Sequence, residues 1–333
     1  MKKTLNNFLA LLAFFFLVLS FSNSYGFIIV EPQDKILVER ELITFVIKAD
    51  DGSADSFSIS GSNRPSNDLN IPIVKGRNFI CKTIELKLGT NEIIVTSIKN
   101  GRIIESKTIT IFNRSDLSSK FRVNPPDFKI DPFHLENREN VCRPCHQMDS
   151  SDKDLKPLKP QDSVCYPCHY KITEYKHVHG PAAKWACLAC HENTSSPLKY
   201  ITPKPEKPLC YKCHENEKDK WAPKKFVHGP VATGRCSICH NPHASNYDFW
   251  LKKSTWNLCV TCHVEMGTGK HTVAPFALFG KHPTKGVKDP LRPGKRLTCA
   301  SCHSPHTSNT KDLLAVEFNI NSKFKFCGRC HKM

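Results

Sequence analysis

Residues 236–263 read "CSICHNPHASNYDFWLKKSTWNLCVTCH" and hold two Cys-x-x-Cys-His motifs whose first cysteines are 23 residues apart. The same motif recurs along the last two thirds of the chain. It occurs eight times, at Cys142-Cys145-His146, Cys165-Cys168-His169, Cys187-Cys190-His191, Cys210-Cys213-His214, Cys236-Cys239-His240, Cys259-Cys262-His263, Cys299-Cys302-His303 and Cys327-Cys330-His331. These motifs use 16 of the 17 cysteines, so one local pattern decides how this part of the chain folds.

The order of residues in the motif matches one particular chemistry. Two thiols about one helical turn apart, followed at once by a histidine, are the attachment signature of c-type haem. Each thiol can form a thioether with one porphyrin, and the histidine is then the proximal ligand of the iron. Structural zinc sites and disulfides also use paired cysteines, but neither explains the histidine in all eight motifs. The sequence therefore predicts eight covalently attached haem c groups.

The motifs fall into four modules of two, with the first cysteines in each module 23, 23, 23 and 28 residues apart. A histidine stands eight residues before the first cysteine in three modules, at His134, His179 and His228, and the last two lie in "HGP". In the fourth module His282 precedes Cys299 at a longer distance. Such a period indicates one structural unit of about 45 residues used four times.

The histidines outside the motifs match the number of distal ligands that eight irons need. Eight remain of the 16 histidines, at His134, His177, His179, His228, His243, His271, His282 and His306. Methionine is the competing sixth ligand and raises the reduction potential, but only Met148, Met266 and Met333 lie in this region. We therefore expect mainly bis-histidine haems of low potential, while the sequence leaves open which histidine serves which haem.

Residues 114–333 provide 220 residues for eight haems, too few for an ordinary apolar core around each. The porphyrin faces must supply that core, with burial contributing roughly 25 cal/mol per Å². We expect short helices at the motifs, proline-rich loops and little sheet.

The mature chain carries a net charge of +15, which nearly equals the 16 negative charges of the propionates of eight haems. The excess of lysine and arginine therefore does not indicate a nucleic-acid partner.

Residues 27–113 have a different composition, with 11 Lys and Arg against 11 Asp and Glu, no histidine, and one cysteine. Alternating apolar and polar residues at 43–49, 91–99 and 103–112 predict strands with one buried face. Asn100-Gly101 predicts a tight hairpin between the last two. The region resembles immunoglobulin-like modules, although it lacks their Cys, Trp and Cys signature, and we interpret it as a docking or spacing element. Cys81 in "FICKTIEL" is predicted to be a buried strand residue, with an exposed reactive thiol as the alternative.

The first residues predict a secretory signal peptide. Lys2 and Lys3 precede an apolar run at residues 8–19, and small or polar residues lead to a cleavage point after Gly26. An uncleaved anchor is the alternative, but the run is shorter than the ~20 residues of a spanning helix. No cysteine follows the cleavage point, as a lipoprotein would require, and no later segment is apolar enough to span a membrane. We expect a periplasmic or cell-surface protein.

The predicted fold class is therefore multidomain. Its parts are a signal peptide at 1–26, an all-β immunoglobulin-like sandwich at 27–113, a linker at 114–133, and an octahaem cytochrome c domain of short helices and loops at 134–333.

The doubled motifs, with "HGP" before the module and "CHNPH" or "CHSPH" inside it, resemble the paired-motif multihaem c-type cytochromes over residues 130–333. This resemblance implies closely stacked haems that carry electrons in anaerobic respiration. The implied partners are redox proteins, other cytochromes, or extracellular acceptors such as metal oxides.

Two other functions stay open at this point. A multihaem reductase of a small oxyanion, of the nitrite or tetrathionate type, needs an iron with an exchangeable position, whereas this chain offers a sixth ligand for each iron. A conductive extracellular filament would join the haems of successive subunits. An electron carrier without catalytic residues is the leading interpretation.

Overall fold

The computed structural model describes residues 26–61, 69–74, 76–130, 132–268, 270–271, 282–315 and 327–331. The predicted signal peptide lies almost entirely outside these residues. The chain divides into two compact units. The first is the chain up to Asn113 with Pro126–Lys129, and the second is Arg114–Pro125 with the chain from Ile130 onward.

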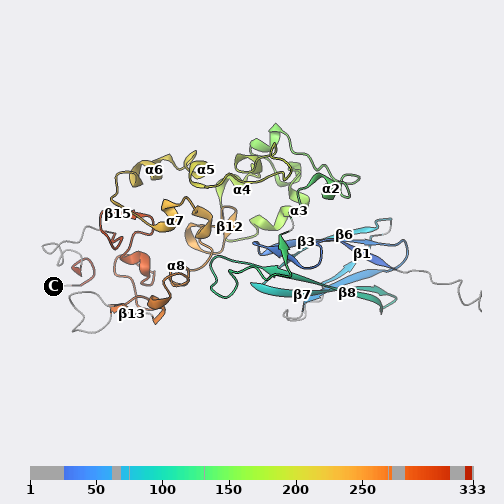
Figure 1. Cartoon of the computed structure of the whole chain (residues 1–333), viewed down its shortest axis with the longest axis horizontal. Helices are drawn as coiled ribbons and strands as arrows, with labels where there is room; N and C mark the ends of the chain where they lie inside the picture. Colours follow the sequence, from blue (N-terminus) through green and yellow to red (C-terminus); the bar gives the residue numbers. More distant parts are fainter. Residues whose placement is uncertain are drawn as a thin grey trace, which may run out of the picture. The chain divides into compact units, whose positions relative to one another are not determined.

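The first unit is built from two β-sheets (Figure 1). One sheet has the order β1-β3-β6, and the other has the order β5-β4-β7-β8-β2-β9. Their strands are β1 (Phe27–Glu31), β2 (Ile36–Val38), β3 (Leu42–Ala49), β4 (Ser56–Gly61), β5 (Leu69–Pro72), β6 (Phe79–Glu85), β7 (Gly89–Lys99), β8 (Arg102–Asn113) and β9 (Lys129–Ile130). The predicted β-sheet region is confirmed, and its likeness to an immunoglobulin domain stays a prediction.

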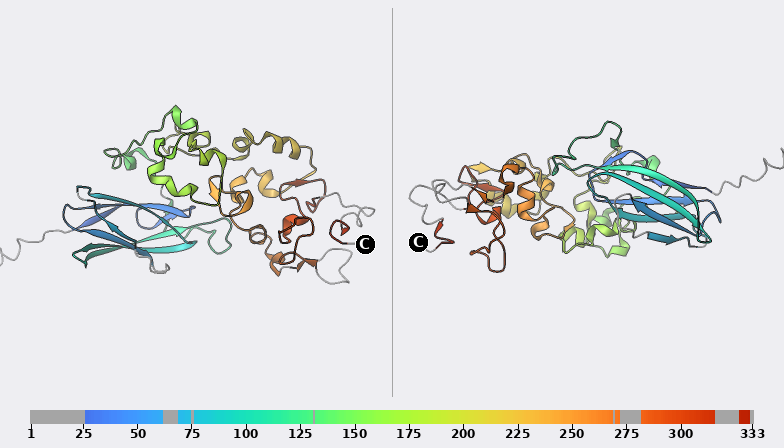
Figure 2. Two further views of the ribbon diagram at one scale, coloured as in Figure 1. Left: turned by 180° about the vertical axis from the view of Figure 1, so that it is seen from behind. Right: turned by 90° about the horizontal axis from the view of Figure 1, so that it is seen from below.

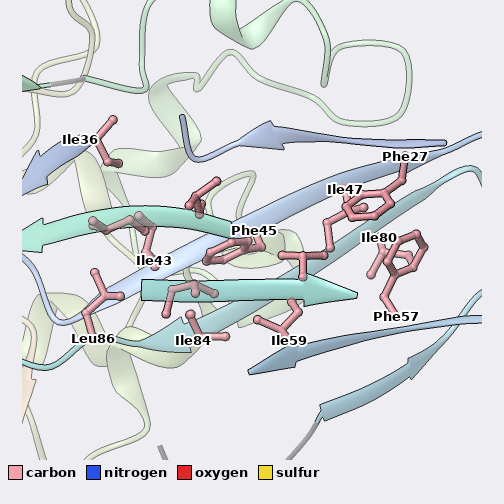
Figure 3. Close-up of a cluster of buried hydrophobic side chains, with 14 of the residues drawn as sticks. Phe27, Ile36, Ile43, Phe45, Ile47, Phe57, Ile59, Ile80, Ile84 and Leu86 are labelled. Carbon is pink, nitrogen blue, oxygen red and sulfur yellow. The ribbon is translucent and has the colours of Figure 1, made fainter. Parts of the chain in front are cut away.

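Alternate side chains of these strands form one apolar core (Figure 3). Ile43, Phe45 and Ile47 of β3 are buried at every second position, as period-two alternation requires. The rings of Phe27 and Phe57 meet edge to face, with centroids 5.1 Å apart. The core of the first unit therefore lies between its two sheets.

The turn between β7 and β8 forms where the sequence predicts it. Asn100 and Gly101 have φ angles of 51° and 74°, and the two strands pair antiparallel from Lys99 and Arg102 onward. Positive φ at both central residues is the requirement of a two-residue hairpin, which asparagine and glycine meet at little cost. The hairpin prediction is confirmed.

The expectation that Cys81 is buried is wrong. Its side chain is exposed on β6, whereas Ile80 and Ile84 of the same strand are buried in the core. Successive strand residues point to opposite faces of a sheet, so burial of Ile80 places Cys81 outward.

The second unit consists of short helices, 3₁₀ turns and two-residue strands (Figures 1 and 2). Its α-helices are α2 (Glu136–Glu139), α3 (Tyr166–His169), α4 (Gly180–Ala183), α5 (Lys207–Tyr211), α6 (Glu215–Trp221), α7 (Gly229–Ala232) and α8 (Thr255–Cys259). Its 3₁₀ helices are η1 (Asp152–Leu155), η2 (Pro160–Asp162), η3 (Tyr170–Thr173), η4 (Cys187–Ala189), η5 (Cys236–Ile238), η6 (Asp248–Trp250), η7 (Val264–Thr268) and η9 (Cys299–Ser301). The strands are β10 (His177–Val178), β11 (Phe226–Val227), β12 (Ala244–Ser245), β13 (Lys270–His271), β14 (His282–Pro283) and β15 (Thr307–Ser308). The prediction of short helices and loops with little sheet is confirmed.

Over the residues that the structure describes, no helix has the length and apolar character needed to cross a bilayer.

Candidate haem-binding sites

All eight motifs adopt the same backbone turn. In each, the backbone N–H of the histidine donates a hydrogen bond of 2.9–3.1 Å to the carbonyl oxygen of the first cysteine. This is one turn of α-helix, which brings side chains three and four residues apart to the same face. The two thiols and the imidazole of every motif are thereby gathered on one side of the backbone, as attachment to one porphyrin requires.

Seven of the eight motif histidines face a second histidine. The imidazole ring centroids in these pairs are 6.0–6.3 Å apart. The pairs, motif histidine first, are His169 with His134, His191 with His243, His214 with His179, His240 with His306, His263 with His228, His303 with His271, and His331 with His282.

This separation fits two imidazoles on opposite sides of one iron. An imidazole nitrogen lies about 2 Å from a bound metal ion and about 1 Å from its own ring centre, so the two ring centres are expected about 6 Å apart. Direct packing of the rings would bring their centroids closer, as in the 4.3 Å contact between Trp221 and His306. The paired histidines therefore leave the space that an iron porphyrin needs.

Six of the seven pairs follow a rule of the modules that sequence spacing did not reveal, and the pair of His303 with His271 is the exception. The histidine that leads a module faces the second motif of its own module, as His179 faces His214. The histidine three residues after a first motif, in contrast, faces the first motif of the preceding module. We call His243 and His306 the crossing histidines, because His243 faces His191 and His306 faces His240.

Two short antiparallel ladders bring the crossing histidines into place. Strand β10 pairs with β12, and the backbone N–H of His179 donates to the carbonyl of His243 at 2.8 Å. Strand β11 pairs with β15 in the same way, with a 2.9 Å bond from the N–H of His228 to the carbonyl of His306. Each ladder thus joins the start of one module to a segment of the next.

Hydrogen bonds at Nδ1 hold the candidate ligands in the tautomer that iron requires. Nδ1 of His191, His240 and His303 lies 2.7–2.8 Å from a backbone carbonyl oxygen nine residues further along the chain. Nδ1 of His179 contacts the carbonyl of Pro242 at 2.9 Å, and that of His282 contacts the carbonyl of Pro283 at 2.8 Å. Because a carbonyl can only accept, Nδ1 carries the hydrogen and Nε2 keeps a lone pair for the metal.

His134 is held by a carboxylate instead. Its Nδ1 lies 2.9 Å from Oε1 of Glu139, whose side chain has no exposed surface. Lys199 Nζ lies 2.5 Å from the other oxygen of Glu139, and Arg143 also approaches it, at 3.5 Å. A carboxylate at the outer nitrogen makes a histidine a more basic ligand. Sequence reasoning missed Glu139, because an ordinary glutamate five residues after a histidine has no local signature.

The environment of the partly buried crossing histidines favours their neutral form at pH 7. Loss of solvent around the ring, with smaller contributions from the neighbouring His191 and His179, lowers the pKa of His243 to about 4. Burial, with His240, likewise lowers the pKa of His306 to about 4. Since a histidine must be neutral to bind metal, this environment favours ligation.

Cysteines of successive motifs lie close together across the module boundaries. The thiols of Cys165 and Cys187 are in hydrogen-bonding contact, which lowers the pKa of Cys165 to about 7 and raises that of Cys187. The same contact joins Cys210 to Cys236 and Cys259 to Cys299. Within modules, charge interactions reach from Cys190 to Cys213, from Cys239 to Cys262 and from Cys302 to Cys330. Neighbouring attachment sites therefore succeed one another in space in the order of the sequence, from the second motif to the eighth.

Tryptophan rings pack against two of the candidate ligand histidines. Trp221 stacks on His306, and Trp250 meets His179 edge to face at 5.2 Å.

Among the cysteines that the structure describes there is no disulfide. In the described ranges, no three His, Cys, Asp or Glu side chains converge as a site for a single metal ion.

The structure does not bring the eighth motif histidine and the eighth other histidine together. Within the described residues, which include all 16 histidines, His146 has no ring contact with another histidine. His177 lies on β10, with Nε2 at 3.3 Å from Oδ1 of Asp248.

Comparison with known families agrees with the motif geometry. Three segments, residues 179–219, 228–268 and 289–333, match the family model described as the doubled CXXCH motif. The chain carries doubled CXXCH motifs. They indicate covalently bound haem c and support a multihaem c-type cytochrome. The module grouping is confirmed for these three segments, while the first module lies outside them and stays a prediction. Comparisons with curated proteins and with solved structures found no match.

Proposed function

We propose that the chain is an octahaem c-type cytochrome that carries electrons and has no substrate chemistry at its bis-histidine haems. The 16 motif cysteines attach the haems, and each motif histidine is a proximal ligand. The distal ligands of the second to the eighth haem are, in that order, His134, His243, His179, His306, His228, His271 and His282.

The observation that carries this proposal is the 6.0–6.3 Å separation of seven histidine pairs. An iron with an imidazole on each side exchanges electrons without binding a substrate. Bis-histidine ligation also favours low potentials within the ~0.8 V range that axial ligands set.

The order of the attachment sites supports a single path. Contacts between Cys165 and Cys187, and between Cys210 and Cys236, support this path because they bring together the attachment motifs of adjacent modules. Electrons would then pass from haem to haem in the order of the sequence.

In this proposal the sandwich at 27–113 is an immunoglobulin-like docking element. The partners are redox proteins, other cytochromes or metal oxides, met in the periplasm or at the cell surface after signal cleavage.

Intact mass spectrometry of the protein made with its haem-attachment machinery tests the count. We expect the mass of the chain from residue 27 with eight haems, and a count below eight would overturn the octahaem proposal. Electron paramagnetic resonance (EPR) of the oxidised protein tests the ligation, and we expect at least seven low-spin ferric haems per chain.

A further inference from the structure

We propose that the haem on the first motif, Cys142-Cys145-His146, has a sixth coordination position that takes a small exogenous ligand. The inference rests on the haem attachment proposed above and goes beyond electron transfer. Two independent observations carry it, one from the geometry of the histidines and one from the repeated loops of the modules.

The first observation is that the described histidines leave His146 without a counterpart. Seven of the other histidines outside the motifs are already opposite a motif histidine. The eighth, His177, lies elsewhere: its backbone pairs with Ser245 in the β10–β12 ladder, and its buried Nε2 lies 3.3 Å from the Asp248 carboxylate but forms no hydrogen bond within the described residues.

The second observation comes from a loop that follows the first motif of the second, third and fourth modules. In each, Nδ1 of the motif histidine contacts the carbonyl nine residues later, on Tyr200, Phe249 and Asp312. An isolated bridge also closes each loop: it joins the motif histidine to the residue eleven positions later in His240–Leu251 and His303–Leu314, and it joins Glu192 to Ile201, one residue inside those positions, in the second module. The three loops therefore share the contact of the motif histidine with the ninth carbonyl, and the loop of the second module differs in the register of its bridge.

The residue that should serve the first haem is missing from the equivalent loop. In the third and fourth modules, position three after the motif histidine is a crossing histidine, which faces the first motif of the preceding module. In the second module that position is Thr194, in "CHENT". By the rule of the modules, a histidine at 194 would serve His146, and threonine offers no imidazole to replace it.

The surroundings of His146 are accessible and balanced in charge. Cys145 is exposed, and the hydroxyl of Tyr200 donates to the carbonyl of Met148 at 3.0 Å. Arg143, inside the motif, forms a 2.5 Å ion pair with Asp149, while Lys199 lies between Asp149 and Glu139. Two positive and two negative groups therefore pair with one another beside the motif and add no net charge there.

One side chain, that of Glu139, links the first motif to the candidate ligand of the second haem. Glu139 contacts both Arg143 of the first motif and His134, the candidate ligand of the second haem. The exchangeable position is thus at one end of the row of haems.

Carbon monoxide titration of the reduced, mass-verified octahaem protein tests the inference. We expect one carbon monoxide bound per chain and, in the oxidised protein, one high-spin ferric EPR signal per chain. If eight haems are present but neither signal appears, the inference is wrong while the octahaem proposal stands. Fewer than eight haems would overturn the octahaem proposal instead.

Variants locate the site. The double change Asn193→Pro with Thr194→His recreates the Cys-His-x-Pro-His sequence, and we expect it to lower carbon monoxide binding at least tenfold. Thr194→Ser is the matched control and should bind as the unchanged protein does. His177→Ala should also leave one carbon monoxide per chain. A second bound carbon monoxide in His177→Ala would show that His177 is an iron ligand and would overturn the assignment.

If the double variant does not fold, His146→Met provides the second test. A change of the proximal ligand should shift the spectrum of the carbon monoxide complex. An unchanged complex would place the ligand on another haem and contradict the inference.

Discussion

Nδ1 of His134 lies 2.9 Å from Oε1 of Glu139, a fully buried carboxylate, whereas Nδ1 of His179 and Nδ1 of His191 contact backbone carbonyls. The second haem therefore has a distal candidate ligand beside a carboxylate, whose negative charge Lys199 and Arg143 partly balance. A negative charge favours ferric iron, which carries one more positive charge than ferrous iron. Carboxylates of Glu217 and Glu265 also approach Nδ1 of His214 and His263, but at 3.7 Å and from exposed side chains.

Glu139→Gln should raise the potential of the second haem. The amide keeps the shape and a hydrogen-bond acceptor but removes the charge, and about 1 kcal/mol between the two iron states corresponds to roughly 40 mV for one electron. A spectroscopic redox titration measures the shift. Glu192→Gln, at the position after His191, is the control. Equal shifts in the two variants would show that the contact with His134 has no special effect.

His243→Met should change the third haem, although residue 243 lies 52 positions after the motif histidine His191. A thioether in place of the imidazole raises the potential, on the order of 100 mV within the ~0.8 V range of axial ligands. A redox titration would show one haem moved upward and its low-spin spectrum retained. His177→Met should leave every potential unchanged, and a shift there in place of the His243 shift would refute the pairing.

The contribution of Asp149 to the free energy of unfolding should depend on pH in the acid range. Hydrogen bonds from Arg143 and Lys199 lower its pKa from 3.8 to about 2. Because the folded-state pKa is depressed, its contribution to stability is fully present above pH 3.8 and is lost as the pH falls toward 2. The difference in unfolding free energy between the unchanged protein and Asp149→Asn should therefore stay constant down to that range and then shrink.

The Asp149 side chain is more than half exposed, so the difference will be small. Denaturant unfolding at a series of pH values measures it. Asp162→Asn, at an exposed position on η2, is the matched control. A difference that grows below pH 3.8 would contradict a depressed pKa of Asp149 in the folded protein.

Gly234→Ala should destabilise the second unit by about 1–3 kcal/mol. Gly234 has a φ of 71°, and an added Cβ would lie 2.9 Å from Cβ of Pro205 and 3.1 Å from Cβ of Lys207. Gly229→Ala meets no atom within 4 Å and is the control. Denaturant unfolding should separate the two variants, and equal stability would mean that the backbone at residue 234 adapts freely.

Cys81 should be the one thiol that reacts with a maleimide in the folded, haem-loaded protein. Its side chain is exposed on β6, and the other 16 cysteines are assigned to thioethers. We expect one label per chain, and none in Cys81→Ser, whose unfolding free energy should change by less than about 0.5 kcal/mol. More than one label would show that haem attachment is incomplete.

The features that the sequence predicts well are those that depend on neighbouring residues. The motif turn joins residues four apart, as from Cys236 to His240, so the spacing of residues in the sequence is enough to predict which side chains come together. The Asn100-Gly101 hairpin is equally local, because its φ angles depend on the two residues themselves. Cys81 shows the limit, since the direction of its side chain depends on which face of β6 meets the core.

By itself, the sequence determined the chemistry of the attachment sites, because two thiols and an imidazole within five residues act as a unit wherever the chain places them. Only the tertiary structure decided which imidazole stands opposite which motif. His243 reaches His191 because β10 pairs with β12, and that pairing joins residues more than 60 positions apart. A distal position depends on such long-range contacts, so the equal numbers of motifs and of histidines outside them could not show that His146 and His177 are apart.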